Sequence, residues 1–377
     1  MYEEKFNERL EKQKVFFSRK EPGDILIYYR RSGALDGVGF PPYFQVFVME
    51  KLSQTRVEAL CNDRESEKLV CNFLEIFRES YKDFYEIDHD ALPTIEVFFG
   101  IGGFTAAMSG GEAKIAGGTS WCEPGWDSWD EIRKLKFNPH SVWVQFASIM
   151  YRALLKYREG DFLLSPFSHR SPLDSATGLR GPTELFFDMH DRPADVRWLL
   201  NWCTEWSISL DNYLSENAGT PGVARGVWGT YLPNRTVFVN GDPVDLISRQ
   251  LEPVFNRPYN EKLFEALGGG FFHHHAIGLH QVDQVALTKD LVIHELYDDP
   301  GVPSVAEVII NDKKMRDKIL EASLKVPIML DDFPFELLDP LLPFLAEGRF
   351  ILRPRIQRED RDAFANITHR IRKSSKI

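Results

Sequence analysis

Short apolar runs alternate with longer amphipathic segments along most of the chain. Eight such runs are rich in Val, Ile, Leu, Phe or Tyr, and several end in polar or glycine residues, as buried parallel strands do. They cover residues 24–31, 94–100, 161–167, 223–229, 270–277, 290–297, 326–330 and 349–355. This alternation predicts parallel strands that are joined by crossover helices.

The segments between these runs predict the helices. The longest cover residues 129–159 and 182–215, and shorter ones cover 243–267, 302–324, 332–346 and 359–373. Asp and Ser residues at several of their starts suit helix N-caps. Eight strand–helix repeats favour a closed (β/α)8 TIM barrel of the α/β class, and an open α/β sheet is the alternative. We expect residues 1–377 to form one such domain, with an N-terminal helical extension over residues 1–20.

Composition and charge narrow the classes of partner. Hydrophobic residues make up 43% of the chain and charged residues 27%, which is ordinary for a globular protein. The formal net charge is −11, and the acidic excess is spread along the chain. Because phosphate backbones require a basic surface, we expect no nucleic-acid partner. A few local arginines could still form a pocket for a small anionic substrate.

The cysteines and the N-terminal segment bear on the cellular compartment. The four cysteines form no CxxC pair, so they predict reduced thiols rather than a zinc ribbon. Residues 1–20 are charged and lack the apolar stretch of a signal peptide. No run of 18 apolar residues occurs, so we expect a cytoplasmic protein without membrane association.

Histidines at the end of the fifth predicted strand are the strongest candidates for chemistry. His273, His274 and His275 are consecutive, and His280 follows shortly after them. Because side chains alternate along a strand, His273 and His275 share one side and His274 faces the other. Imidazoles in such a place can act as general acid or base, or as metal ligands. The alternative is that they only form hydrogen bonds with neighbouring loops.

A carboxylate on the next predicted strand completes this candidate site. Glu295 could orient His275, or it could join His275 and His280 as a ligand of a metal such as zinc. The alternative is a salt bridge behind the site. We therefore predict His273, His275 and Glu295 as catalytic residues, and His275, His280 and Glu295 as the metal ligands.

Arginines at both ends of the predicted barrel are candidates for anion binding. Arg30 and Arg31 follow the first strand, and Arg353 and Arg355 lie on one side of the last strand. The first and last strands of a closed barrel are neighbours, and guanidinium groups match carboxylate or phosphate with two hydrogen bonds. The alternative is an ion-pair network with acidic residues of the rim.

Three further strand ends carry candidate residues. Asp331 and Asp332 follow the seventh predicted strand, where one would cap the next helix and Asp332 could serve as an acid. His169 follows the third strand and is a candidate substrate ligand. Trp228 belongs to a group of tryptophans that could form an apolar wall for a substrate, although packing in the core is the alternative.

Four segments, in this order and spacing, resemble the uroporphyrinogen decarboxylase-like superfamily, which includes corrinoid methyltransferases. They are FFGIGGFTAAMSGG at 98–111, SPFSHRSPLDSATGLRGPTELFFDMHDRPADV at 165–196, the order Pro, Asn-Gly-Asp, Ile-Ser and Pro-Tyr within 231–259, and GGGFFHHHAIGLHQVD at 268–283. The resemblance covers most of the chain after residue 90 and indicates a divergent member. It implies the barrel fold, a homodimer and a substrate-facing short helix that carries Asp174, a further candidate catalytic residue.

Departures from the family pattern bear on the expected activity. The arginine-rich motif of the decarboxylases is replaced by YYRRSG at 28–33. The His-x-Cys zinc motif of the methyltransferases reads His275-Ala276-Ile277, and no cysteine follows Cys203. A metal would therefore need histidine, carboxylate or Cys122 as ligands.

Three functions remain open from the sequence. The first is methyl transfer on a small carboxylated or methoxylated compound, with zinc in the site and a corrinoid carried by a partner protein. The second is decarboxylation of a porphyrinogen or another carboxylic acid, in which arginines hold the carboxylates and a His or Asp delivers the proton. The third is a barrel that binds a small ligand without catalysis.

Overall fold

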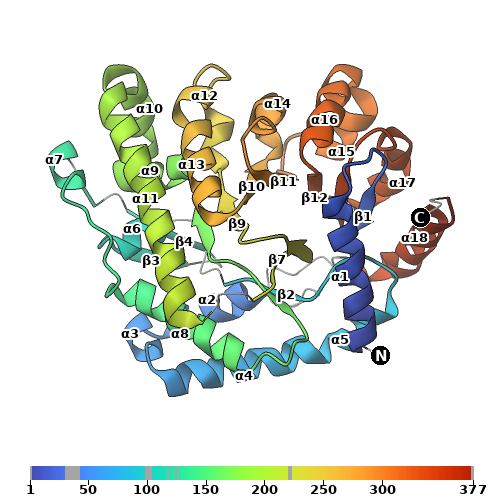
Figure 1. Ribbon diagram of the computed structural model, residues 1–377, viewed down its shortest axis with the longest axis horizontal. Helices are drawn as coiled ribbons and strands as arrows, with labels where there is room; N and C mark the ends of the chain where they lie inside the picture. Colours follow the sequence, from blue (N-terminus) through green and yellow to red (C-terminus); the bar gives the residue numbers. More distant parts are fainter. Residues whose placement is uncertain are drawn as a thin grey trace.

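A computed structural model describes residues 2–29, 43–97, 104–116, 119–123, 125–126, 128–219 and 223–374. Arg30 and Arg31, the predicted anion ligands after the first strand, lie outside the described residues and stay predictions. In Figure 1 the helices lie around the outside of the strands, with α13, α14 and α16 on one side and α4 and α8 on the opposite side.

The largest sheet has seven parallel strands in the order β1-β13-β12-β11-β10-β9-β6. Their bounds are Ile25–Ile27 (β1), Ser168–Arg170 (β6), Val237–Asn240 (β9), Gly270–His275 (β10), Leu291–Tyr297 (β11), Ile328–Pro334 (β12) and Phe350–Arg355 (β13). Parallel strands buried on both faces are typical of α/β proteins, so the predicted α/β class is confirmed.

The remaining strands form two smaller sheets. One has the order β2-β5-β7-β8 and the other is the β3-β4 hairpin. Their bounds are Thr94–Ile95 (β2), Ala113–Ala116 (β3), Thr119–Cys122 (β4), Leu163–Leu164 (β5), Arg225–Val227 (β7) and Thr230–Leu232 (β8). A single closed ring of eight parallel strands, as predicted, is therefore not shown.

Two local features explain the difference from the predicted ring. The third predicted strand, 161–167, contains only β5, and β6 begins just after it; Pro166, between them, has no N–H to donate to a strand ladder. The fourth predicted strand, 223–229, contains β7, which pairs with β8 as an antiparallel hairpin. The strand that adjoins β10 is instead β9, which the sequence analysis assigned to no element.

The predicted helical segments contain helices, but several are divided, and the segment 332–346 begins within β12. The helices α2 to α6, between residues 44 and 108, were not predicted. Pro193 starts a new helix at its first position, so the predicted helix 182–215 is α10 and α11. The helix bounds are Tyr2–Ser18 (α1), Phe44–Gln54 (α2), Val57–Leu60 (α3), Asp63–Glu79 (α4), Tyr81–Glu86 (α5), Phe104–Met108 (α6), Trp129–Ile132 (α7), Val142–Lys156 (α8), Pro172–Arg180 (α9), Pro182–Asp191 (α10), Pro193–Ala218 (α11), Glu252–Phe255 (α12), Arg257–Leu267 (α13), Val282–Val285 (α14), Val305–Asn311 (α15), Lys313–Lys325 (α16), Leu338–Leu341 (α17) and Arg361–Ser374 (α18). Two short 3-10 helices, Asp242–Leu246 (η2) and Ala276–Gln281 (η3), follow β9 and β10.

Strand β10 separates two apolar clusters. Phe271 packs in the larger cluster, and Phe272 packs in a second cluster with Val237 and Val239 of β9 and residues of α13. Successive side chains of a strand point to opposite faces, so Phe271 lies on the same face as His273 and His275. The strand thus presents apolar residues early and imidazoles at its carboxyl end.

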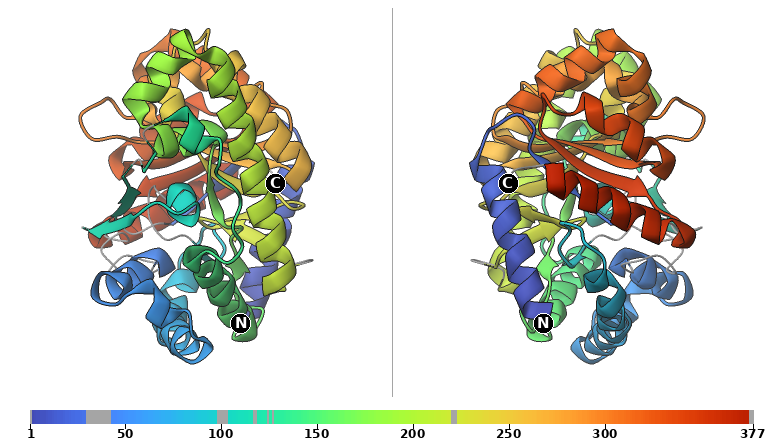
Figure 2. Two further views of the ribbon diagram at one scale, coloured as in Figure 1. Left: turned by 90° about the vertical axis from the view of Figure 1, so that its left-hand side faces the viewer. Right: turned by 90° about the vertical axis from the view of Figure 1, so that its right-hand side faces the viewer.

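The N-terminal helix α1 packs on the body of the molecule. Gln13 is fully buried, and its amide nitrogen donates to the carbonyls of Asp90 at 2.7 Å and Gly229 at 2.8 Å. Asp90 also contacts Lys12 of α1 at 2.7 Å and Arg372 of α18 at 3.1 Å, and Figure 2 shows these two terminal helices on the same side. Within the described residues, no helix combines the length and the apolar character that crossing a membrane requires.

Candidate metal centre

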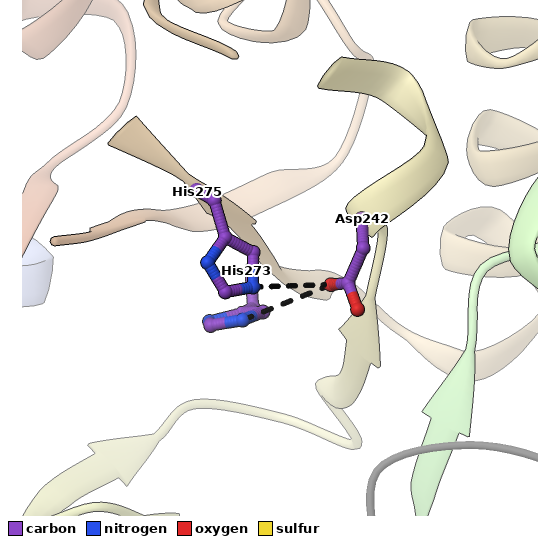
Figure 3. A group of neighbouring side chains, drawn as sticks. All are labelled: Asp242, His273 and His275. Carbon is purple, nitrogen blue, oxygen red and sulfur yellow. Dashed lines mark ion pairs between the residues drawn. The ribbon is translucent and has the colours of Figure 1, made fainter. Parts of the chain in front are cut away.

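Two histidines of β10 and an aspartate after β9 meet at the carboxyl ends of their strands. Asn240 of β9 is in register with His273 of β10, so Asp242, at the start of η2, lies beside the histidines. Its Oδ1 atom is 3.8 Å from His273 Nε2 and 3.7 Å from His275 Nε2 (Figure 3). The three candidate ligand atoms lie within 4.8 Å of one another, which suits one metal ion between them.

The outer nitrogens of both histidines are held by carboxylates. His273 Nδ1 lies 3.0 Å from Glu295 Oε2, and His275 Nδ1 lies 2.7 Å from Asp299 Oδ1. An ionised carboxylate only accepts hydrogen bonds, so the Nδ1 atoms carry the protons and the Nε2 lone pairs face Asp242. Carboxylates behind metal-binding histidines orient the rings in this way in known metal sites.

The electrostatics keep Asp242 ionised and His273 neutral. Burial opposes ionisation of Asp242, but the charge of Arg170, joined by the two histidines when they are protonated, outweighs it, and the pKa of Asp242 is lowered. Burial lowers the pKa of His273, although Asp242 opposes this effect. A carboxylate and a neutral imidazole are the forms that bind metal.

One oxygen of Asp242 accepts no hydrogen bond within the part of the chain that the structure describes. Oδ1 is buried and has no hydrogen bond from the described residues, whereas Oδ2 binds Arg170 at 3.1 Å. A buried carboxylate oxygen without a hydrogen bond is costly, and a cation bound between it and the imidazoles would remove that cost. The residues present therefore fit a divalent metal with two histidine ligands and one carboxylate ligand.

The opposite face of β10 holds a second histidine pair. His274 Nδ1 lies 2.8 Å from Asp245 Oδ1, and His274 Nε2 lies 2.7 Å from His294 Nε2. The other oxygen of Asp245 accepts from the backbone N–H of His275 at 3.1 Å. A Cβ atom on Gly278 would lie 1.7 Å from Asp245 Oδ1, so glycine at this position leaves room for the network that anchors the end of β10.

The predicted metal set is only partly brought together. His275 lies in the cluster, but Glu295 contacts the outer nitrogen of His273 rather than His275. His280 does not join them, because helix η3 directs its Nε2 to the carbonyl of Ile247 at 3.2 Å. The geometry therefore corrects the candidate ligands to Asp242, His273 and His275, and the functional roles stay predictions.

The predicted arginines of the last strand are ion-paired. Arg353 lies 2.5 Å from Asp331 Oδ2, and Arg355 lies 3.0 Å from Asp332 Oδ2. Asp332 also accepts from the hydroxyl of Tyr297 at 2.9 Å, so its position is fixed by side chains around it. These contacts correspond to the ion-pair alternative, and anion binding by Arg353 and Arg355 and acid catalysis by Asp332 stay predictions.

Two other candidates adjoin the cluster, and a third does not. Arg170 pairs with Asp174 at 2.5 Å and with Asp242 at 3.1 Å, so it links the two carboxylates. Burial raises the pKa of Asp174 to about 6, although Arg170 opposes this effect. The ring of Trp228 lies 5.6 Å from that of His273. The partner of His169 is instead Asp211, at 3.9 Å.

Sequence reasoning missed Asp242 and Asp299. Asp242 lies two residues after the short segment Val237–Asn240, and recognising that segment as a strand would have placed Asp242 at a strand end. Asp299 lies two residues beyond the end of β11, and the predicted strand, 290–297, stops short of it. The missed signal was in both cases the exact end of a strand.

The imidazole-bound carboxylate Glu295 provides a test of the site that does not depend on substrate. Glu295→Gln is expected to weaken binding of Co²⁺ by about 10-fold to 100-fold, because an uncharged amide orients His273 less firmly. The measurement is a titration with Co²⁺, followed by the visible absorbance of the bound ion. Glu216→Gln, at an exposed position of α11, is the matched control and should bind Co²⁺ as the unaltered protein does. Equal affinities for both variants would contradict the role of Glu295.

Known proteins resemble this chain in fold rather than in sequence. No protein-family model matches the chain, and no curated protein sequence matches it. Among solved structures, a methyltransferase from Methanosarcina mazei superposes with a TM-score of 0.54 and 12% sequence identity. The similarity covers 97% of this chain and 98% of that chain. At this identity the likeness concerns the fold alone, and the two chains share it over nearly their whole lengths.

Proposed function

We propose that this chain is a metal-dependent enzyme that transfers a methyl group from a small methoxylated or carboxylated compound to the corrinoid of a partner protein. The observation that supports it most is the group of Asp242, His273 and His275, in which one buried carboxylate oxygen faces two oriented imidazole nitrogens. The fold likeness to a protein named as a methyltransferase favours this chemistry over decarboxylation.

Each residue of the site has a part in this proposal. Asp242, His273 and His275 would hold a divalent ion, for which zinc suits the donors, and the ion would act as a Lewis acid toward a substrate oxygen. Glu295 and Asp299 orient the two imidazoles. Arg170 balances the charge of Asp242. Asp174 retains a proton up to about pH 6, and we assign it the delivery of a proton to the oxygen that loses the methyl group.

We also propose that the two larger sheets form one closed (β/α)8 ring. Strands β5 and β6 follow each other within one segment, and each belongs to a different sheet. On the other side, the backbone N–H of Asp90 donates to the carbonyl of Ile27 in β1 at 2.8 Å, shortly before β2 begins. These two links support a ring of β1, β2, β5 with β6, and β9 to β13. A crystal structure would test it: backbone hydrogen bonds between β1 and residues 88–96 would support the ring, and an unpaired edge of β1 would contradict it.

The activity is tested with cob(I)alamin as acceptor and methoxybenzoate as donor. The CH3–O bond breaks, the cobalt of cob(I)alamin supplies the electron pair of the new CH3–Co bond, and the phenolate oxygen takes a proton. Methylcobalamin is expected to form with the metal-loaded protein and to be followed by its visible absorbance. His275→Ala should abolish it, whereas His190→Ala, at an exposed position of α10, should not. Equal rates for both variants, or no methylcobalamin with any methoxylated acid, would contradict methyl transfer at this site.

A further inference from the structure

The turn between β7 and β8 holds a tryptophan in a left-handed backbone conformation. Trp228 has φ 48° and Gly229 has φ 85°, and Val227 pairs with Thr230 on either side. Two-residue hairpin turns with positive φ at both positions favour Asn-Gly, because a bulky side chain at the first position is strained. Such strain persists only where the surroundings hold it, and it is concentrated at functional sites.

Two side chains of β2 and its continuation hold this turn. Glu96 Oε1 accepts from the backbone N–H of Trp228 at 2.8 Å, and Thr94 Oγ1 accepts from that of Gly229 at 3.0 Å. The Thr94 hydroxyl in turn donates to Glu96 Oε1 at 2.7 Å. Both residues are buried, and burial raises the pKa of Glu96 although Thr94 opposes it. Both N–H groups of the strained turn are therefore bound by one buried pair.

The rest of the turn is fixed as tightly. The carbonyl of Gly229 accepts from the backbone N–H of Leu92 and from the side chain of Gln13, each at 2.8 Å. A Cβ atom on Gly229 would lie 2.8 Å from the Cβ of Ala91, so the backbone approaches too closely for any other residue. Hydrogen bonds and close contacts with other segments therefore hold the turn in this conformation.

This conformation places the indole beside the metal centre. The ring of Trp228 lies 5.6 Å from that of His273 at an interplanar angle of 72°, and 4.7 Å from that of Phe238. The guanidinium carbon of Arg353 lies 5.3 Å from the indole centroid. Trp228 is half-buried, so part of its surface remains for contact with a ligand.

We propose that Trp228 is a specificity-determining residue of the metal centre, and that Glu96 and Thr94 are the positioning residues that hold it. The indole covers an apolar group, such as a methyl, on an anion whose oxygen binds the metal. This inference rests on the metal centre of the proposed function, and it narrows the substrate class to small anions that carry a methyl group close to the metal-binding oxygen. Packing alone does not explain the arrangement, since an unstrained turn residue would fill the core without this restraint.

The test compares acetate with formate on the protein loaded with Co²⁺. Acetate differs from formate by one methyl group, whose burial against the indole changes affinity by about fourfold. We define the preference for acetate as the dissociation constant of formate divided by that of acetate, both measured from the visible absorbance of Co²⁺. This ratio should therefore fall by about fourfold in Trp228→Asn. The intrinsic preference of the metal for acetate is the same in all variants and does not affect the change. Because asparagine suits the left-handed turn, the thermal midpoint of this variant should stay close to that of the unaltered protein.

Variants of Glu96 separate positioning from packing. Glu96→Gln keeps an acceptor oxygen for the Trp228 N–H and should show the same ratio as the unaltered protein. Glu96→Leu removes the acceptor, so the ratio should fall as it does in Trp228→Asn. Thr94→Val, which removes the acceptor of the Gly229 N–H, gives the same comparison if Glu96→Leu does not fold. An unchanged ratio in Trp228→Asn would overturn the role of the indole, and an unchanged ratio in both Glu96→Leu and Thr94→Val would overturn their positioning role. Failure of the unaltered protein to bind Co²⁺ would refute the proposed metal centre itself, and this inference with it.

Discussion

Replacing Asp242 with alanine is expected to lower the affinity for Zn²⁺ or Co²⁺ by about two to three orders of magnitude. Zinc bound by four protein ligands gains about 10–16 kcal/mol, or roughly 2.5–4 kcal/mol for each ligand, and each 1.4 kcal/mol is about a factor of ten. Asp242 is the only anionic member of the candidate ligand set, so its loss also removes the charge that attracts the cation.

The measurement is metal content after dialysis against a weak chelator, with the dissociation constant determined by competition. Asp191→Ala, at an exposed position at the end of α10, removes an equal charge away from the site and should leave metal content unchanged. Thermal unfolding without metal should show that Asp242→Ala remains folded, because Arg170 keeps Asp174 as a partner. Metal retained at the same affinity without Asp242 would reject the candidate ligand set.

The two histidines of this site can be predicted from the local sequence, but its aspartate cannot. Three consecutive histidines on a strand place His273 and His275 on one face by the period of the strand alone. Asp242 requires knowledge that Val237–Asn240 is a strand and that it adjoins β10. A run of three apolar residues is too short to be distinguished by periodicity from an irregular segment, and the longer run at 223–229 competes with it.

The strands of the fold likewise differ in whether the local sequence predicts them. The strands β10 to β13 were predicted because each begins with a short apolar run, after which polar residues follow at the carboxyl end. The hairpin β7-β8 was not predicted, because its turn is Trp228-Gly229 rather than Asn-Gly. The N–H groups of this turn donate to Thr94 and Glu96, more than a hundred residues away, and these hydrogen bonds stabilise it. Turn propensity depends on the residues of the turn itself, so it does not identify a turn that distant side chains stabilise.

The charged residues show a further limit of sequence reasoning. Arg353 and Arg355 were expected to face an anion, but strand register places Asp331 opposite Arg353 and Pro334 opposite Arg355. The neighbouring aspartates are therefore within reach, and both arginines pair with them. Sequence shows that an arginine ends a strand, and only the pairing of the strands shows which charge it meets.

The ion pair of Arg353 leads to the largest expected effect on stability. Arg353→Met should lower the free energy of unfolding by about 3–5 kcal/mol, because it leaves the charge of Asp331 in a buried position without its guanidinium. The side chains of Arg353 and Asp331 are 6% and 2% exposed, and their ion-pair distance is 2.5 Å. Equilibrium unfolding in urea, followed by circular dichroism, measures the change.

Arg355→Met is the matched control, since it removes the same charge from the same strand. The Arg355 side chain is 43% exposed, so its ion pair with Asp332 should contribute no more than about 1 kcal/mol. Adding Asp331→Leu to Arg353→Met should recover part of the lost stability, because no buried charge then remains at the pair. A loss of stability in Arg353→Met as small as that in Arg355→Met would mean that burial does not govern these pairs. In that case Arg353 would be free to exchange Asp331 for a substrate carboxylate at little cost, and the role of anion binding predicted for it would gain support.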